Sequence, residues 1–301
     1  MKRGAMVFAL LAVASHAMAQ KEAENLFRSN ETVAVEITAP WRELQRDESE
    51  RAWPATITWT DEAGQMQTLG LTVERRGISR QRVCDFPPIR LRFEKRVTDE
   101  GLFDHQKSLK LVTHCKDSDR WQQYYILEML AYRIFNLMTD ISFRVRPLEI
   151  TYTDSDRGKS LDPKFGFVIE DDKAVARRLG LKKLDVESTR PGRLEPLEAS
   201  RLALFQMMIG NLDWSPLTGP DGKCCHNGKL IGRDPQDVPV FAIPYDFDST
   251  GLVNPPYAVP PAALPVRSIR TRMYRGYCAH NATLEAARAQ ILDLRPQITG
   301  L

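Results

Sequence analysis

The sequence predicts an α+β fold of two lobes, in which an antiparallel, β-rich lobe is followed by a mostly helical lobe. Three observations lead to this prediction. Short alternating or β-branched runs fill the first third of the chain, a long segment with two apolar faces follows, and helical patterns and Pro/Gly-rich loops make up most of the remainder. The chain has 301 residues, 43% of them hydrophobic, which is enough for one large domain with its own core. We expect a ligand to bind in the cleft between the lobes.

The first nineteen residues have the three parts of a secretory signal in order. Lys2 and Arg3 form a positive start, residues 5–14 are apolar, and residues 17–19 give the small-residue cleavage pattern. We therefore expect cleavage after Ala19 and a periplasmic or secreted protein. Removal of the segment leaves 40 Lys+Arg (42 less 2) against 39 Asp+Glu, so the mature chain is nearly neutral.

The first lobe is predicted to hold an antiparallel sheet with one face toward water. Its strands are expected at 33–37, 55–59, 67–73 and 89–93, where residues alternate or are β-rich. In the last run, Arg90 and Arg92 lie on the face opposite the apolar residues. A further strand is expected at 107–112.

The rest of the chain contains the predicted helices and two more strands. Apolar stripes on two faces of 120–138 indicate a long, mostly buried helix. We expect strands at 148–152 and 165–169, helices at 172–180, 197–209 and 281–294, and loops at 217–232 and 254–265. Residues 20–301 are predicted to form one domain, with lobes at about 31–169 and 170–301.

Five cysteines follow the signal segment, in a compartment where disulfides persist. Cys84 and Cys115 flank two strand-like runs, so a disulfide between them is expected. Cys278 is expected to reach Cys224 or Cys225, because adjacent cysteines rarely bond to each other. The sequence therefore predicts two disulfides and one free thiol, with the pairing left open.

Composition and hydropathy argue against two classes of partner. The net charge of +3 is small, and no Lys/Arg run has interleaved aromatic residues, so we expect no nucleic-acid partner. No apolar stretch of 18 residues follows the N-terminal segment, so we expect no membrane span.

Acidic side chains mark the first candidate site. Asp213 directly follows a predicted apolar helix, and Asp246 and Asp248 end an apolar strand, where they share a face if the strand continues. Carboxylates in such places need solvent, a partner or a metal. Together with the amide oxygen of Asn227 they form an oxygen-rich set that suits Mg²⁺ or Mn²⁺. The alternative is that each Asp stabilises a turn.

Basic side chains mark the second candidate site. Lys110 faces away from its leucine neighbours in the 107–112 strand, and Glu128 lies on the aromatic stripe of the long helix, where it needs a cationic partner. We expect the two to pair, with the Lys110 ammonium also directed toward phosphates. The run around Arg76 places a Gly and a Ser among arginines and can cradle an anion. An ordinary salt bridge and a β-turn are the alternatives.

Taken in order from about 71 to 257, these segments resemble the CotH-type spore-coat protein kinase family, an atypical branch of the kinase-like fold. Residues 76–80, Arg-Gly-Ile-Ser-Arg, are similar to the family's R-G-N-S segment, and residues 107–111 resemble its K-x-x-K-L strand. The strand at 165–171 resembles the G-x-Y-x-x-x-E strand that leads into the hinge. Asn-Leu-Asp at 211–213 resembles the N-x-D of the catalytic loop. His-Asn at 226–227 resembles the H-x-x-N that follows, and Pro-Tyr-Asp at 244–246 resembles the P-W-D segment.

The resemblance implies a bilobal kinase-like fold and phosphoryl transfer from ATP with Mg²⁺ or Mn²⁺. It makes Lys110 the phosphate-contacting lysine and Glu128 its helix partner, places Arg76 in the loop over the phosphates, and places adenine near Glu170.

On the other side of the expected cleft, the resemblance makes Asp213 the base that orients the attacking hydroxyl. It makes Asn227 and Asp246 the metal ligands. Asn227 departs from the family pattern, because it follows Asp213 by 14 residues where such loops usually leave about five.

Three functions remain open at this stage. The first is an exported kinase-type phosphotransferase that modifies a hydroxyl of a small molecule or of an envelope or secreted protein. The second is a catalytically inactive, pseudokinase-like binding or structural module of the cell envelope. The third is a metal-dependent hydrolase of another kind.

Overall fold

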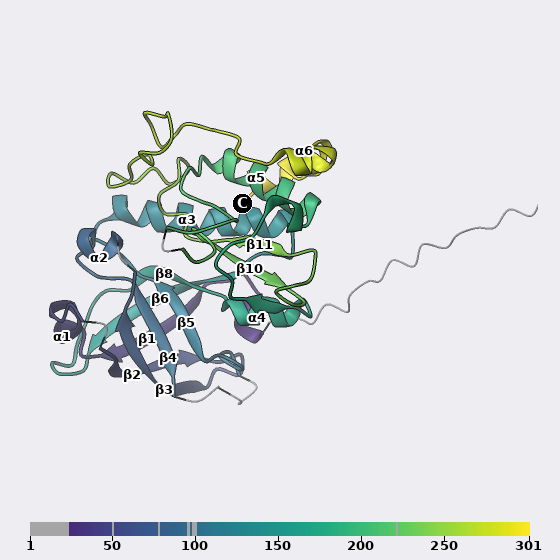
Figure 1. Ribbon diagram of the computed structural model, residues 1–301. Coiled ribbons are helices and arrows are strands. Elements are labelled where there is room, and N and C mark those ends of the chain that lie inside the picture. Colours follow the sequence, from purple (N-terminus) through teal and green to yellow (C-terminus); the bar gives the residue numbers. More distant parts are fainter. Residues whose placement is uncertain (1–23, 50, 78, 95–96, 98–100, 221) are drawn as a thin grey trace, which may run out of the picture.

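The computed structural model describes residues 24–49, 51–77, 79–94, 97, 101–220 and 222–301 (Figure 1). The predicted signal segment at 1–19 lies outside the described residues. Over the described ranges, no helix is both long enough and apolar enough to cross a membrane.

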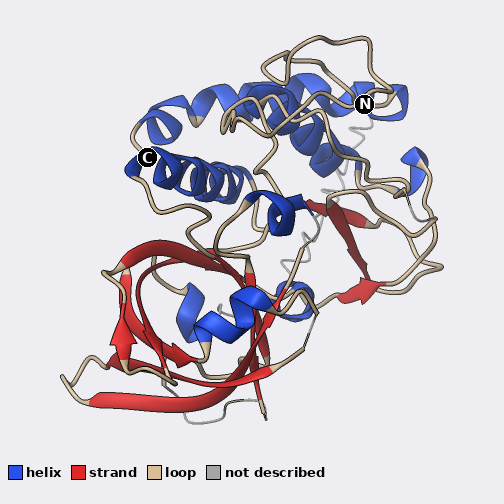
Figure 2. Ribbon diagram, turned by 90° about the vertical axis from the view of Figure 1, so that its left-hand side faces the viewer, coloured by secondary structure: helices blue, strands red, loops and turns tan. Residues whose placement is uncertain are grey.

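Seven strands from the first part of the chain form a closed barrel (Figures 1 and 2). Its strands, in spatial order, are β1 (Val33–Ala39), β2 (Trp53–Thr60), β3 (Met66–Arg75), β4 (Ile89–Phe93), β5 (Ser108–Val112), β8 (Lys164–Ile169) and β6 (Val145–Asp154). The short strand β7 (Lys159–Ser160) pairs with β6 beside the barrel. Neighbouring strands are antiparallel except β1 and β6, which run parallel from Val33↔Leu148 to Ala39↔Asp154 and close the barrel.

The barrel interior is filled by alternate side chains, because successive residues of a strand point to opposite faces. On β4, Ile89, Leu91 and Phe93 are buried, while Arg90 and Arg92 lie on the outer face as the sequence predicts. The short helix α1 (Trp41–Arg46) packs on β6, where the Trp41 and Tyr152 rings meet edge to face with their centroids 5.2 Å apart. The barrel therefore has a hydrophobic core of its own.

The predicted α+β bilobal kinase-like fold is wrong, because the strands close into a barrel where an open antiparallel lobe was expected. The second part of the chain is also less helical than predicted: it holds three more strands and long loops, and helices account for only 29% of the chain. The alternation of apolar and polar residues along a strand does not distinguish an open sheet from a closed barrel, because both bury one face of each strand. Closure depends on the pairing of β1 with β6, two segments far apart in the sequence.

The second part packs against the barrel through the long helix α3 (Asp119–Met138), which contacts β6, β8 and α5 (Figure 1). The other helices are α2 (Ser79–Val83), α4 (Asp172–Arg178), α5 (Pro196–Ile209), α6 (Asn281–Asp293) and α7 (Arg295–Thr299), with 3₁₀ turns at Asn25–Phe27, Pro191–Arg193 and Cys278–His280. A small antiparallel sheet has the order β11 (Phe241–Pro244), β10 (Gly228–Gly232) and β9 (Lys182–Leu184). Tyr132, Phe135, Phe205 and Phe247 lie in the core between α3, α5 and the end of β11.

Most predicted elements exist at the expected positions. The helix predicted at 120–138 is α3. Tyr132 and Phe135 of its aromatic stripe are buried, whereas on the aliphatic stripe Ile134 is buried and Ile126 is exposed. The predicted loop at 217–232 differs, because its last five residues form β10. Strand β10 lies between β9 and β11, and these partners become available to it only in the folded chain.

Two disulfides and one free cysteine are present. Cys84 and Cys115 form the expected disulfide, with an S–S distance of 2.01 Å, and tie the end of α2 to the segment after β5. The expectation that Cys278 pairs with Cys224 or Cys225 is wrong: the two adjacent cysteines are bonded to each other, and Cys278 is exposed and free.

Candidate functional site

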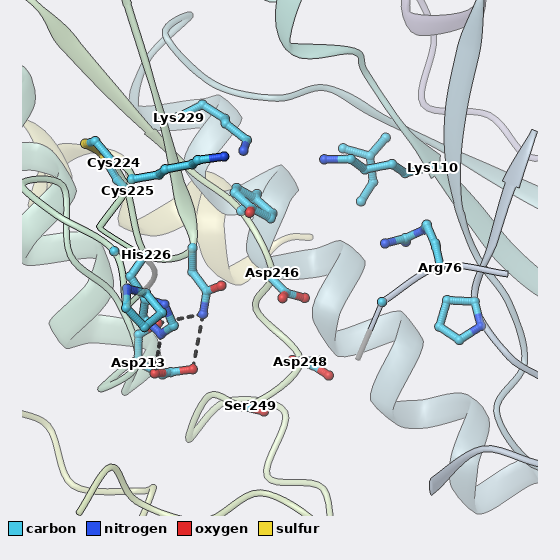
Figure 3. A pocket seen from close by; sticks show the side chains of 18 of the residues that line it. Arg76, Lys110, Asp213, Cys224, Cys225, His226, Lys229, Asp246, Asp248 and Ser249 are labelled. Atoms are coloured by element: carbon cyan, nitrogen blue, oxygen red, sulfur yellow. Dashed lines mark hydrogen bonds and ion pairs between the residues drawn. A yellow bond between two sulfur atoms is a disulfide. The ribbon is translucent and has the colours of Figure 1, made fainter. Parts of the chain in front are cut away.

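A cavity of about 890 Å³ lies between the barrel wall, α3 and the small sheet. Its lining comes from segments far apart in sequence, and Figure 3 shows several of its charged side chains. Six of the seven site residues predicted from the sequence line this cavity: Arg76, Lys110, Glu128, Asp213, Asn227 and Asp246. The volume is within the range of pockets that hold ligands of nucleotide size.

The end of helix α5 places Asp213 at the cavity. Gly210 takes a left-handed conformation with φ 66°, a backbone geometry that glycine adopts freely, and this ends the helix after Ile209. The backbone N–H of Asp213 then donates to the side-chain oxygen of Asn211 at 2.9 Å, which fixes the turn. The Asp213 side chain remains 44% exposed.

The loop after Asp213 returns to it and brings two predicted residues into contact with its carboxylate. Ser215 and His226 pair through two backbone hydrogen bonds of 3.0 Å. His226 Nε2 lies 2.6 Å from Asp213 Oδ1, and Asn227 Nδ2 donates to the Asp213 backbone oxygen at 2.8 Å and to Oδ2 at 3.2 Å (Figure 3). The 14-residue separation therefore does not keep Asn227 from Asp213.

Asp246 and Asp248 have different environments. The backbone of Asp246 is left-handed, with φ 65°, and its N–H donates to the Tyr132 hydroxyl at 3.0 Å. The carboxylate of Asp246 has no hydrogen-bond or ion-pair partner among the described residues and reaches the cavity. Asp248 is instead buried, accepting from Arg80 Nε at 3.0 Å and from the Tyr257 hydroxyl at 3.1 Å.

The surroundings of Asp246 favour its protonated form. Asp246 is exposed to the cavity, but the protein atoms packed around its carboxyl group desolvate it in part, and this raises the pKa of Asp246 to about 6. The neighbouring carboxylate of Asp248 raises this pKa further. The cations Arg80, Arg76 and Lys110 act in the opposite direction.

Glu128 pairs with Arg80, and the expected pair of Glu128 with Lys110 is wrong. Arg80, on helix α2, donates to Glu128 through one of its terminal nitrogens and to Asp248 through Nε, and all three side chains are buried. Burial raises the pKa of Glu128 to about 7, while Arg80 lowers it. Arg80 ends the arginine-rich run that was expected to bind an anion, so the sequence pointed to this segment but not to its carboxylate partners.

Lys110 and Arg76 are the cations left uncommitted on the barrel side. Lys110 Nζ lies 4.7 Å from the centroid of the Tyr245 ring, and neither side chain has an ion-pair partner among the residues that the structure describes. Arg76 donates through Nε to the Ile89 oxygen at 3.2 Å. Burial lowers the pKa of Lys110 to about 8, and the positive charges of Arg76 and Lys229 lower it further. Figure 3 shows Arg76 and Lys110 on the side of the cavity opposite Asp213.

Glu170 lies apart from these residues. It is buried, accepts from Arg178 at 2.9 and 3.2 Å and from the Arg144 backbone N–H at 3.0 Å, and does not line the cavity. The structure therefore gives Glu170 a structural role in joining α4 to the end of the barrel. Sequence reasoning gave no role to two further cavity residues: Lys229 on β10, two residues after Asn227, and Tyr245 after β11, within the Pro-Tyr-Asp segment.

Within the described part of the chain, no three His, Cys, Asp or Glu side chains are grouped as ligands for a metal ion. A comparison with protein-family models found no match, and a comparison with curated proteins found no relative.

Proposed function

We propose that the cavity binds a nucleoside triphosphate such as ATP together with Mg²⁺ or Mn²⁺. The protein would transfer the terminal phosphoryl group to a hydroxyl of a small molecule or of an envelope or secreted protein. The observation that carries this proposal is the arrangement of uncommitted charges in the cavity. Arg76 and Lys110 lie on one side of it, Asp213 lies on the opposite side, and Asp246 lies between them. The proposal rests on this site and not on a kinase-like fold.

The barrel side is suited to phosphate oxygens. Arg76 and Lys110 have no carboxylate partner among the described residues, so their charges are available to a ligand. A guanidinium and an ammonium bind phosphate through charge-assisted hydrogen bonds, which are about twice as strong as neutral ones. Inside a cavity that limits water, they also offset the negative charge that spreads over the transferred group.

Asp246 and Asn227 offer oxygen ligands for a hard cation. The Asp246 carboxylate and the side-chain oxygen of Asn227 accept no hydrogen bond from the described residues, and both residues line the cavity. Sites of phosphoryl transfer commonly hold Mg²⁺ with one or two carboxylates, completed by phosphate oxygens and water. These two residues therefore fit the cation, which would neutralise charge on the phosphates.

Asp213 is the residue placed to accept a proton. Asn227 and His226 hold its carboxylate in one orientation, and each carboxylate oxygen keeps a further lone pair for an incoming hydroxyl. As the acceptor oxygen bonds to the terminal phosphorus, the bond from that phosphorus to the bridging oxygen breaks. Asp213 takes the hydroxyl proton, and the products are a phosphoester and a nucleoside diphosphate.

The first test is a thermal-shift titration of the protein with ATP, with and without Mg²⁺ or Mn²⁺. A ligand that binds only the folded state stabilises it by about 2.7 kcal/mol at a hundredfold excess over Kd. We expect a metal-dependent shift that Asp246→Asn abolishes and that Asp293→Asn, an exposed carboxylate on α6, retains. Absence of any shift at millimolar ATP would contradict the proposal.

A second measurement separates transfer from binding alone. Asp213→Asn is expected to keep ATP binding and to lose phosphate incorporation into an acceptor, measured with γ-labelled ATP. If the wild-type protein binds ATP but transfers no phosphate to any acceptor or to water, the binding module replaces the phosphotransferase.

A further inference from the structure

Two lysines from different parts of the fold converge on one aromatic ring. Lys110 Nζ, from barrel strand β5, lies 4.7 Å from the centroid of the Tyr245 ring, and Lys229 Nζ, from β10 of the small sheet, lies 5.2 Å from the same centroid. Figure 3 shows both side chains extending toward the middle of the cavity, with Arg76 near Lys110. We use the name three-cation cluster for Arg76, Lys110 and Lys229.

None of the three members of this cluster forms an ion pair in the described ranges of the chain, although the negative charges of Asp246 and Asp172 act on Lys110 from a distance. The nearby Asp172 is already paired with Lys183 at 3.5 Å. One tyrosine ring attracts a cation only weakly. The like charges oppose each other: burial is the largest cause of the lowered pKa of Lys110, about 8, and the positive charges of Arg76 and Lys229 lower it further. A ligand with several negative charges would offset this repulsion.

The cavity lacks the residue that was expected to contact a nucleobase. Glu170, the residue expected beside adenine, is held by Arg178 and does not line the cavity. The residues that do line it include the cations Arg76, Lys110 and Lys229. The structure therefore offers many partners for a phosphate chain, while the one predicted partner of a base lies elsewhere.

We propose that Lys229 completes a site for a linear oligophosphate, so that the donor is recognised through its phosphate chain and not through its base. This inference rests on the proposed function and deepens it. Arg76 and Lys110 contact the chain from the barrel side, and Lys229 contacts it from the small sheet. A chain of phosphates carries more negative charge than a single phosphate and offers oxygens to both walls at once, so it offsets the repulsion more fully.

The test measures binding by calorimetry to the intact protein in the presence of Mg²⁺. The probes are inorganic tripolyphosphate, ATP, GTP, AMP and orthophosphate. We expect comparable affinities for tripolyphosphate, ATP and GTP, and much weaker binding of AMP and orthophosphate. Lys229→Met is expected to weaken tripolyphosphate binding about tenfold or more, the size of one lost charge-assisted hydrogen bond.

Three controls keep the outcome clear. Lys182→Met, on the neighbouring strand β9 and exposed, should bind like the wild type. Lys229→Arg keeps the charge and should retain most of the affinity. Thermal unfolding of Lys229→Met without ligand checks that the variant is folded.

Two results would overturn the inference while leaving the proposed function intact. One is ATP binding that Lys110→Met weakens and Lys229→Met does not. The other is tight binding of ATP without binding of tripolyphosphate or GTP. If the wild-type protein binds neither ATP nor tripolyphosphate, the proposed function itself fails and the inference fails with it.

Discussion

At the scale of single residues, Asp246 and Asp248 show how two similar carboxylates acquire different roles. They are separated by one residue, and the pattern of residues around them does not distinguish them; only the family resemblance selected Asp246. In the structure Asp248 is buried against Arg80 and Tyr257, whereas the left-handed backbone of Asp246 presents an unpaired carboxylate to the cavity. The candidate ligand is therefore Asp246, and Asp248 helps to hold the arginine beside it.

The raised pKa of Asp246 predicts how metal binding depends on pH. A carboxylate must lose its proton to bind a cation, so the affinity for Mn²⁺ should rise as the pH increases through about 6. Asp246→Asn should bind weakly and with little pH dependence in this range. A titration followed by Mn²⁺ electron paramagnetic resonance at several pH values measures both. Equal pH profiles for the variant and the wild type would contradict the assignment.

The raised pKa of Asp246 also predicts how the stability of the metal-free protein depends on pH, and here the effect of rising pH is unfavourable. The folded pKa of about 6 exceeds the ordinary value of 3.8, so the folded state binds more protons than the unfolded state between these values. The contribution of Asp246 to the free energy of unfolding should therefore fall as the pH rises from about 4 to about 6. Urea unfolding at fixed pH values, compared with Asp246→Asn, should show a smaller decrease for the variant.

Arg80 predicts the cost of removing one member of a buried ion pair. Arg80→Leu leaves Glu128 and Asp248 buried with no cation bonded to them, and we expect a loss of about 3–5 kcal/mol in the free energy of unfolding. Arg82→Leu, an exposed position on the same helix, should change stability by less than about 0.5 kcal/mol. Urea unfolding of both variants measures the difference. A loss at Arg80 no larger than at Arg82 would show that the network contributes little.

At the scale of elements, the end of α5 decides where Asp213 lies. Gly210 has φ 66°, and a Cβ added there would lie 3.2 Å from the Cα of Gly251. The positive φ and the close approach of Gly251 both favour glycine at this position. The end of α5 and its contact with the 250–252 segment therefore depend on Gly210. The helix end in turn positions the turn that carries Asp213.

Gly210→Ala is therefore expected to lower the free energy of unfolding by about 1–2 kcal/mol, the cost of a left-handed conformation in a residue with a Cβ. Gly192→Ala is the matched control, since its added Cβ meets nothing within 4 Å and its φ is not positive. Chemical denaturation compares the two. An effect at Gly192 equal to that at Gly210 would contradict this explanation.

At the scale of the whole molecule, closure of the barrel removes the free edge of β1. One edge of β1 pairs with β2 and the other with β6, and this second pairing is the one that an open sheet would lack. We therefore expect slow hydrogen exchange for the backbone amides throughout Val33–Ala39, close to the rate set by global unfolding. The short edge strand β7 (Lys159–Ser160) should exchange much faster. If alternate amides of β1 exchange as rapidly as those of β7, the barrel is open in solution.

The sequence by itself determined most of the elements and much of the candidate site. Local periodicity located α3, α5 and the strands of the barrel, because burial on one face leaves a repeat of 3.6 or 2 residues. Residue chemistry selected Lys110, Asp213 and Asp246, which the fold brings to one cavity although they lie far apart in the chain. The disulfide between Cys84 and Cys115 also followed from the strands that they flank.

Only the tertiary structure decided how these parts join. Barrel closure, the pairing of Arg80 with Glu128, the burial of Glu170 by Arg178, and the approach of Lys229 to Tyr245 are contacts between segments distant in sequence. No local pattern encodes which partner a buried charge takes, because several side chains of the right sign compete for it. The choice depends on distances that exist only after the barrel, α3 and the small sheet have packed together.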